Sequence, residues 1–272
     1  MDPRLQRRVQ RYGWDRAVSD YERGWRRQLV PAQRRLLEMA DLRPGERVLD
    51  VACGTGLVTF PAAEAVGPSG FVLGTDLSEG MVGALRAEAE RSGLRQVRAE
   101  RMDAEELSVP DGDFDAALCG LGLMYVPDPG RALSEMRRAL KPAGRAVLAV
   151  WGAREGCGWA EIFPIVDARV NTEVCPLFFQ VGTGDYMQIA MEAVGFQEIE
   201  VERLSVVLSY ESGDDALVAA FTGGPVALAY SRFDGATREA AHEEYLASIE
   251  PYRSGEGYEI PGEFVVARGV KG

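Results

Sequence analysis

The chain has 272 residues, of which 46% are hydrophobic, and a formal net charge of −12 at pH 7. A chain of this length can bury one large core, or a core with a small lid, and its negative charge disfavours a general nucleic-acid-binding protein. No stretch approaches the ~18 consecutive apolar residues of a membrane span, and the first residues lack the apolar segment of a secretory signal, so we expect a cytoplasmic protein without a membrane span.

The cysteines and the basic residues limit the chemistry further. The four cysteines show no C-x-x-C spacing, and the single histidine offers them no set of metal-ligand partners, so we expect reduced thiols and no metal site. Residues 1–35 carry ten arginines and four acidic residues. This basic arm either contacts an anionic partner or pairs with acidic surface as a solvated helix.

Residues 1–45 are expected to form one or two helices ahead of the first strand. Trp14, Tyr21 and Trp25 recur at roughly helical spacing. Pro31 is suited to the first turn of a second helix.

The chain is organised around residues 48–56, which read VLDVACGTG. A short apolar run that ends in a Gly-rich turn before a helical stretch predicts a buried parallel strand over 47–52 and a helix over 57–66. Because glycine has no Cβ, a ligand can lie against the backbone of the turn, facing the free N–H groups of the helix. A dinucleotide site needs G-x-G-x-x-G, but Thr59 holds the third glycine position. Asp50 suits a cationic ligand instead.

This stretch resembles motif I of the class I S-adenosylmethionine-dependent methyltransferases, acid-x-Gly-x-Gly-x-Gly, with Ala52 for the first glycine. S-adenosylmethionine carries a sulfonium and an ammonium group. The resemblance implies that it binds along Asp50, Ala52, Cys53, Gly54, Thr55 and Gly56. It also implies an aromatic N-terminal helix over the cofactor, for which Tyr21 and Trp25 are the candidates. Simple packing residues, and a turn that binds nothing, are the alternatives.

A second acidic residue follows the next predicted strand, residues 71–75. Asp76 comes 20 residues after Gly56, where an acid accepts hydrogen bonds from ribose hydroxyls. The sequence GTDLS resembles the second methyltransferase motif, and Leu77 and Met81 are expected beside the cofactor. Asp76 could instead cap the helix predicted over 79–92, although Ser78 is the better cap.

Two more strand ends carry candidate residues. Asp103 and Ala104 follow the strand predicted over 97–101, and the resemblance implies that they bind the adenine amino group and ring. The strand over 114–119 ends in CGLGLMYVPDP, which resembles motif IV, where the methyl group meets its acceptor. Cys119 is expected at the cofactor, and Tyr125 either touches the acceptor or only lines the pocket.

Strands alternate with helices as far as the strand predicted over 145–151, which indicates a doubly wound parallel sheet with ligands at the carboxyl ends of its strands. We predict an α/β, Rossmann-like seven-stranded sheet whose last strand is antiparallel, with N-terminal helices and a helical C-terminal lid insertion. The expected parts are a helical cover (1–45), a cofactor-binding core (46–151), and substrate-side insertions with lid helices and the last strands (152–272).

Methyl transfer by in-line displacement needs alignment and exclusion of water more than covalent chemistry. His242, on a predicted lid helix, is either a general base or a solvent-facing residue. The predicted function is methyl transfer from S-adenosylmethionine to a small, largely apolar acceptor, with oxygen, nitrogen and carbon all open as the acceptor atom. The alternatives are an S-adenosylmethionine-binding regulatory module without turnover and a nicotinamide-dependent oxidoreductase.

Overall fold

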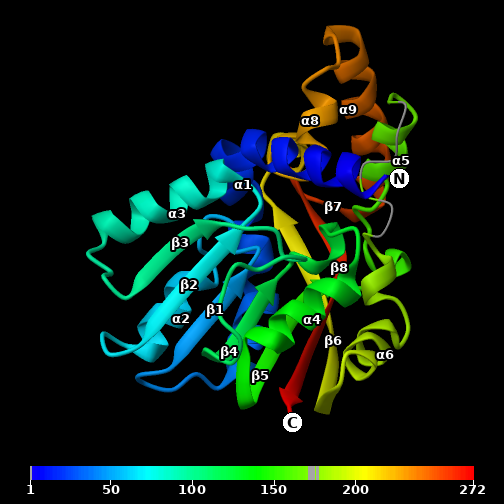
Figure 1. The fold of residues 1–272 in the computed structure, drawn as a ribbon. Coiled ribbons are helices and arrows are strands. Elements are labelled where there is room, and N and C mark those ends of the chain that lie inside the picture. Colours follow the sequence, from blue (N-terminus) through cyan, green and yellow to red (C-terminus); the bar gives the residue numbers. More distant parts are fainter. Residues whose placement is uncertain (1, 171–174, 176–177) are drawn as a thin grey trace.

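The computed structural model describes residues 2–170, 175 and 178–272. Figure 1 shows a twisted sheet with α4 in front of it and part of α1 behind it. The strands are β1 (Arg47–Val51), β2 (Phe71–Asp76), β3 (Val97–Arg101), β4 (Phe114–Gly120), β5 (Leu140–Trp151), β6 (Phe196–Tyr210), β7 (Arg253–Ser254) and β8 (Gly257–Lys271). The α-helices are α1 (Pro3–Ala40), α2 (Thr59–Val66), α3 (Glu79–Arg91), α4 (Pro129–Ala139), α5 (Ile162–Asp167), α6 (Tyr186–Ala193), α7 (Gly213–Leu217), α8 (Ala227–Tyr230) and α9 (Gly235–Ile249).

The strand order along the sheet is β3-β2-β1-β4-β5-β8-β6. The first five strands pair in parallel, and β8 inserts antiparallel between β5 and β6. The predicted α/β sheet with an antiparallel last strand is therefore confirmed. The structure adds the two-residue β7, which pairs with β8 directly after the turn that joins them.

Burial explains the sequence patterns of the strands. Val48 and Leu49 in β1 and the run from Ala146 to Val150 in β5 are fully buried. Strands covered by helices on both faces have no solvent side, so they read as continuous apolar runs. β6, at the edge of the sheet, instead alternates polar and apolar residues and leaves Val207 exposed.

The N-terminal segment is one helix of 38 residues, not two. Pro31 lies inside α1, although proline removes a backbone hydrogen bond there and its ring crowds the preceding turn. Leu29, Ala32 and Leu36, which flank it, are all buried. Their burial keeps the segment helical through Pro31, whose own ring faces solvent.

The predicted start of α3 is confirmed, whereas α2 begins two residues later than its predicted start at Leu57. α2 begins at Thr59, so Pro61 falls in its first turn, where proline is tolerated. α3 begins after Ser78, whose Oγ accepts a hydrogen bond from the Met81 N–H at 3.1 Å. None of the helices in the described ranges has both the length and the apolar character that crossing a bilayer requires.

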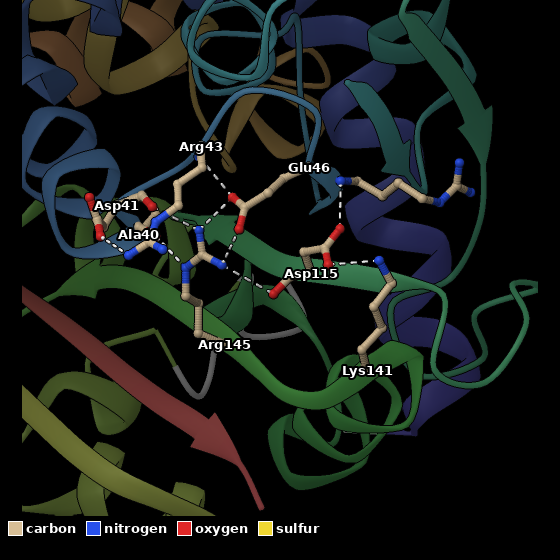
Figure 2. A network of polar contacts seen from close by, with 8 residues as sticks. Ala40, Asp41, Arg43, Glu46, Asp115, Lys141 and Arg145 are labelled. Carbon is tan, nitrogen blue, oxygen red and sulfur yellow. Dashed lines mark hydrogen bonds and ion pairs between the residues drawn. The ribbon is translucent and has the colours of Figure 1, made fainter. Parts of the chain in front are cut away.

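A polar network ties the end of α1 to the amino-terminal edge of the sheet (Figure 2). The Arg145 guanidinium donates to both carboxylate oxygens of Glu46, at 2.9 and 2.7 Å, and to the backbone carbonyls of Ala40 and Asp41. Lys141 lies 2.7 Å from a carboxylate oxygen of Asp115. These contacts lie opposite the carboxyl ends of the strands, so they hold the scaffold rather than a ligand.

Candidate functional site

A cavity opens at the carboxyl ends of the central strands, where the strand order reverses between β1 and β4. Open α/β sheets bind ligands at this switch point. The cavity holds about 750 Å³ of empty space, including its open mouth. Its walls are Arg7, Gln10, Trp14, Tyr21, Ala52, Gly54, Thr75, Asp76, Leu77, Met81, Met102, Asp103, Ala104, Gly120, Leu121, Gly122, Tyr125, Val126 and Pro127.

Nine predicted site residues line this cavity together: Tyr21, Ala52, Gly54, Asp76, Leu77, Met81, Asp103, Ala104 and Tyr125. Six others do not line it: Asp50, Cys53, Thr55, Gly56, Cys119 and Trp25. All six are buried, so they support the walls from behind. Trp25 packs deeper, where its indole N–H donates to the Ala219 carbonyl at 3.1 Å.

The turn after β1 presents bare backbone to the cavity. Ala52 and Gly54 adopt the left-handed conformation, with φ of 56° and 55°. Glycine takes that conformation freely, whereas it strains an alanine. The Gly54 N–H donates to Asp76 Oδ2 at 2.9 Å, and the Cys53 N–H donates to the Thr75 carbonyl at 2.9 Å. The turn after β1 is thus held by the end of β2.

Two carboxyl groups, the half-buried Asp76 and the buried Asp50, make the site attractive to a cation. Asp76 also accepts a hydrogen bond from the Ser78 N–H at 2.9 Å, and burial raises its pKa to about 6. Asp50 is fully buried and accepts from the Thr59 hydroxyl at 2.6 Å; burial raises its pKa to about 7. Its Oδ1 has no hydrogen-bond partner among the described residues. A positive ligand beside them would favour the ionised form of both.

Asp103 lines the cavity but is already engaged. Its Oδ2 lies 2.7 Å from Arg7 Nε, in an ion pair whose angle does not suit a hydrogen bond, and its Oδ1 accepts from the Glu105 N–H at 3.0 Å. Arg7 also pairs with Glu105. An adenine amino group would therefore share this carboxylate with an arginine from α1.

The first half of α1 forms the roof of the cavity, which sequence reasoning only partly foresaw. Arg7, Gln10 and Trp14 line the cavity from α1 together with Tyr21. Asp15 fastens the helix to the start of α3, because its Oδ1 accepts from the Ser78 hydroxyl at 2.6 Å and from the Gly80 N–H at 3.1 Å. Only the helical spacing of the aromatic residues hinted at this role; the anchoring polar residues left no local signal.

Tyr125 stands in a short 3₁₀ turn, η1 (Leu123–Tyr125), with its ring edge-on to Trp14 at 5.1 Å between centroids. Burial raises the pKa of its hydroxyl well above the usual value, so it remains protonated at neutral pH. His242 lies on α9, 2.9 Å from the Tyr230 hydroxyl, and is absent from the cavity walls. The His242 imidazole is half-buried and stacks on the Tyr230 ring, so it does not face solvent freely.

The sequence matches proteins of known chemistry, and the fold matches solved structures. Residues 48–144 match the family model described as a methyltransferase domain. Over 132 residues the chain is 40% identical to nocamycin O-methyltransferase from Saccharothrix syringae, covering 48% of this chain and 47% of that protein. Over 152 residues it is 34% identical to demethylmenaquinone methyltransferase from Bacillus cytotoxicus, covering 56% and 62%. The YcgJ protein from Bacillus subtilis superposes with a TM-score of 0.64 and 18% identity, over 89% of this chain and 98% of that one.

Residues 48–144 form a class I S-adenosylmethionine-dependent methyltransferase domain. The matched part spans 47% and 62% of the two curated relatives. The domain supplies β1 to β4 and the cavity residues from Ala52 to Pro127, whereas the roof comes from α1, outside the matched region. The residues present suit a cationic nucleoside cofactor, because within the described ranges neither the buried carboxyl group of Asp50 nor the carboxylate of Asp76 forms an ion pair.

Proposed function

We propose that this protein transfers the methyl group of S-adenosylmethionine to a small, largely apolar acceptor. The observation that carries the proposal is a pair of neighbouring cavities: a cavity walled by Asp76 and Asp103 shares Trp14, Tyr21, Leu121 and Tyr125 with a second, apolar cavity. The first cavity suits a polar, positively charged nucleoside. The second suits an acceptor that water solvates poorly.

In this proposal Asp76 accepts hydrogen bonds from the ribose hydroxyls, since its two oxygens keep lone pairs beyond those used by Gly54 and Ser78. Ala104 and Met102 contact the adenine. Bound S-adenosylmethionine supplies a methyl group already activated by positive sulfur. The chain itself aligns the acceptor and excludes water, with α1 as the roof.

No strong base is needed for this chemistry. Of the described residues around the apolar cavity, only Tyr21 and Tyr125 titrate, and burial raises the pKa of both. As the bond from sulfur to methyl breaks and the bond from methyl to acceptor forms, any acceptor proton must pass to solvent. Acceptors that ionise readily, such as enols and acidic phenols, are therefore favoured over alcohols.

Calorimetric titration with S-adenosylhomocysteine tests the cofactor site. Asp76→Ala should weaken binding by about 1.5–3 kcal/mol, the range for a charge-assisted hydrogen bond. Asp111→Ala is the control, since that side chain is 79% exposed and absent from the cavity walls. Equal affinities for the wild type and Asp76→Ala would contradict the ribose assignment. Binding without methyl transfer to any of a broad panel of phenols, enols and amines would favour the regulatory module.

A further inference from the structure

A separate hollow, the basic hollow, adjoins the cofactor cavity and shares some of its wall residues. It encloses about 580 Å³ of empty space including its mouth, and water can enter about 270 Å³ of it. One water molecule needs about 10–15 Å³ of such space, so a polyatomic ion has ample room. The described residues that wall the basic hollow are Arg7, Arg8, Arg11, Leu77, Arg101, Met102 and Asp103.

The walls of the basic hollow are dominated by arginine. Four of the seven described wall residues are arginines, and Asp103 is the one acidic residue among them. Arg7 already compensates Asp103, because its Nε lies 2.7 Å from the carboxylate, and Arg7 also pairs with Glu105. The basic character of the hollow therefore comes from the other three arginines.

These three arginines have little negative charge beside them. Arg8 and Arg11 form no ion pair with any residue that the structure describes. Arg101 Nε lies 3.9 Å from the Glu79 carboxylate, beyond hydrogen-bond distance, and Glu79 is closer to Arg86, at 3.1 Å. Arg8 and Arg11 are three residues apart on α1, and Arg101 ends β3. Like charges from two elements thus border one hollow, and an anion bound there would relieve their repulsion.

The number and type of these side chains favour a phosphate group. A phosphate monoester carries a charge of about −1.5 to −2 at neutral pH and offers three strong acceptor oxygens. The N–H groups of a guanidinium form a planar fork that matches phosphate oxygens. A carboxylate has one charge and two oxygens, so it serves three arginines less well.

We propose that the basic hollow binds a phosphate group, either free or carried on a larger molecule, between Arg8 and Arg11 of α1 and Arg101 of β3. Because α1 also forms the roof of the cofactor cavity, a bound phosphate joins that roof to the sheet. It therefore tightens cofactor binding. The phosphate site rests on the hollow alone, whereas its effect on the cofactor rests on the proposed function.

Inorganic phosphate is the first probe. It is titrated into the full chain by calorimetry, with and without S-adenosylhomocysteine, and sodium chloride of equal ionic strength controls for screening. We expect one phosphate to bind per chain. S-adenosylhomocysteine should bind about tenfold more tightly in saturating phosphate than in chloride, the lower end for one hydrogen bond to a charged group. The nucleoside should tighten phosphate binding by the same factor, because coupling between two sites is reciprocal.

Substitutions locate the site. Arg101→Gln, and the double variant with Arg8→Gln and Arg11→Gln, should each weaken phosphate binding at least about tenfold, because each removes charge-assisted hydrogen bonds. Arg16→Gln is the matched control. It removes another α1 arginine that forms no ion pair within the described ranges but lies outside the hollow, so phosphate affinity should stay nearly unchanged.

Vesicles of phosphatidylcholine, with and without phosphatidic acid, distinguish a lipid headgroup from the free ion. Binding of inorganic phosphate that is lost in Arg101→Gln supports a site for the free ion. Vesicle binding that requires phosphatidic acid, is lost in Arg101→Gln and persists in Arg16→Gln supports a headgroup site.

Three results would overturn the proposal. They are no response to either form of phosphate beyond that to chloride, an equal loss of binding in Arg16→Gln and Arg101→Gln, and phosphate binding that leaves nucleoside affinity unchanged. Failure of the proposed function is seen separately, as absence of S-adenosylhomocysteine binding. Phosphate titration of the nucleoside-free protein and its variants then still decides whether the basic hollow is a phosphate site.

Discussion

At the residue scale, Ala52 and Gly122 form a tight pair under the cofactor cavity. A Cβ added at Gly122 would lie 2.3 Å from the Ala52 Cβ and 3.0 Å from Cys119 Sγ. Ala52 itself bears left-handed strain of about 1–2 kcal/mol. The alanine of this motif is thus accommodated only because residue 122 has no side chain.

Gly122→Ala should lower the free energy of unfolding by about 1–3 kcal/mol through overpacking. Adding Ala52→Gly should restore much of that loss, since the opposing Cβ is gone. Urea denaturation of the wild type, the two single variants and the double variant gives the coupling free energy between the two positions. Gly83→Ala is the control, because nothing lies within 4 Å of the added Cβ; it should be stabilising by about 0.5–1 kcal/mol. Additive effects of the two changes would contradict the contact.

Asp50 and Asp76 also predict how cofactor binding depends on pH. Both pKa values, about 7 and about 6, lie above the ordinary 3.8 because the groups are buried. Their protonated forms favour the folded state, so this contribution to the stability of the ligand-free protein is present below pH 4 and is lost as pH rises through 6 to 7. A sulfonium ligand favours the ionised forms.

We therefore expect S-adenosylmethionine to bind about tenfold more tightly at pH 7.5 than at pH 5.5, with release of protons. S-adenosylhomocysteine, which lacks the sulfonium charge, should show a weaker trend. Calorimetry in buffers of different ionisation enthalpy measures both quantities. Asp50→Asn should weaken the pH dependence of S-adenosylmethionine affinity. Identical pH profiles for the two ligands would refute this electrostatic account.

At the scale of elements, α1 is both a roof and a structural helix. Its first half crosses the cavity, fastened by Asp15 to α3 and by Arg7 to Asp103, and its second half descends along the sheet to the opposite edge (Figure 1). We therefore predict that cofactor exit requires the first half to lift away from the start of α3.

Asp15→Ala removes both bonds to α3, so S-adenosylhomocysteine should dissociate about tenfold faster, corresponding to one or two net hydrogen bonds. Asp20→Ala, an acidic residue of α1 that makes no ion pair within the described ranges, should leave the rate unchanged. Stopped-flow displacement measures the rates. A normal dissociation rate in a folded Asp15→Ala protein would mean that the helix does not limit exit.

At the scale of the whole molecule, binding and scaffold functions lie at opposite edges of the sheet. The Arg145 network of Figure 2 joins α1, β1, β4 and β5 at the amino-terminal edge, with Arg145 only 13% and Glu46 only 17% exposed. Removing one partner of such a pair leaves the other charge and two carbonyls poorly satisfied.

Arg145→Met should lower the free energy of unfolding by about 2–4 kcal/mol, a little less than for a fully buried pair. The affinity for S-adenosylhomocysteine should not change. Arg34→Met breaks an exposed pair with Glu38 and should leave the free energy of unfolding nearly unchanged. Urea denaturation and calorimetry check both statements; a cofactor affinity that falls with stability would show that the two edges are coupled.

The sequence by itself determined the strands, their order of alternation with helices, the turn after β1, and the acids at the ends of β1 and β2. These features follow from periodic burial and from turn chemistry, which act over a few neighbouring residues. The same logic predicted that Asp50 would face the ligand, but only the three-dimensional packing turned it toward Thr59.

The tertiary structure alone decided what closes the site. Arg7 meets Asp103, Asp15 meets Ser78, and Trp159 joins Trp25 on the walls of the apolar cavity, each across a long separation in the chain. It also decided that α1 continues through Pro31, because burial on both sides outweighs the local preference of proline. Contacts of this kind depend on how whole elements pack, and no local pattern of residues encodes them.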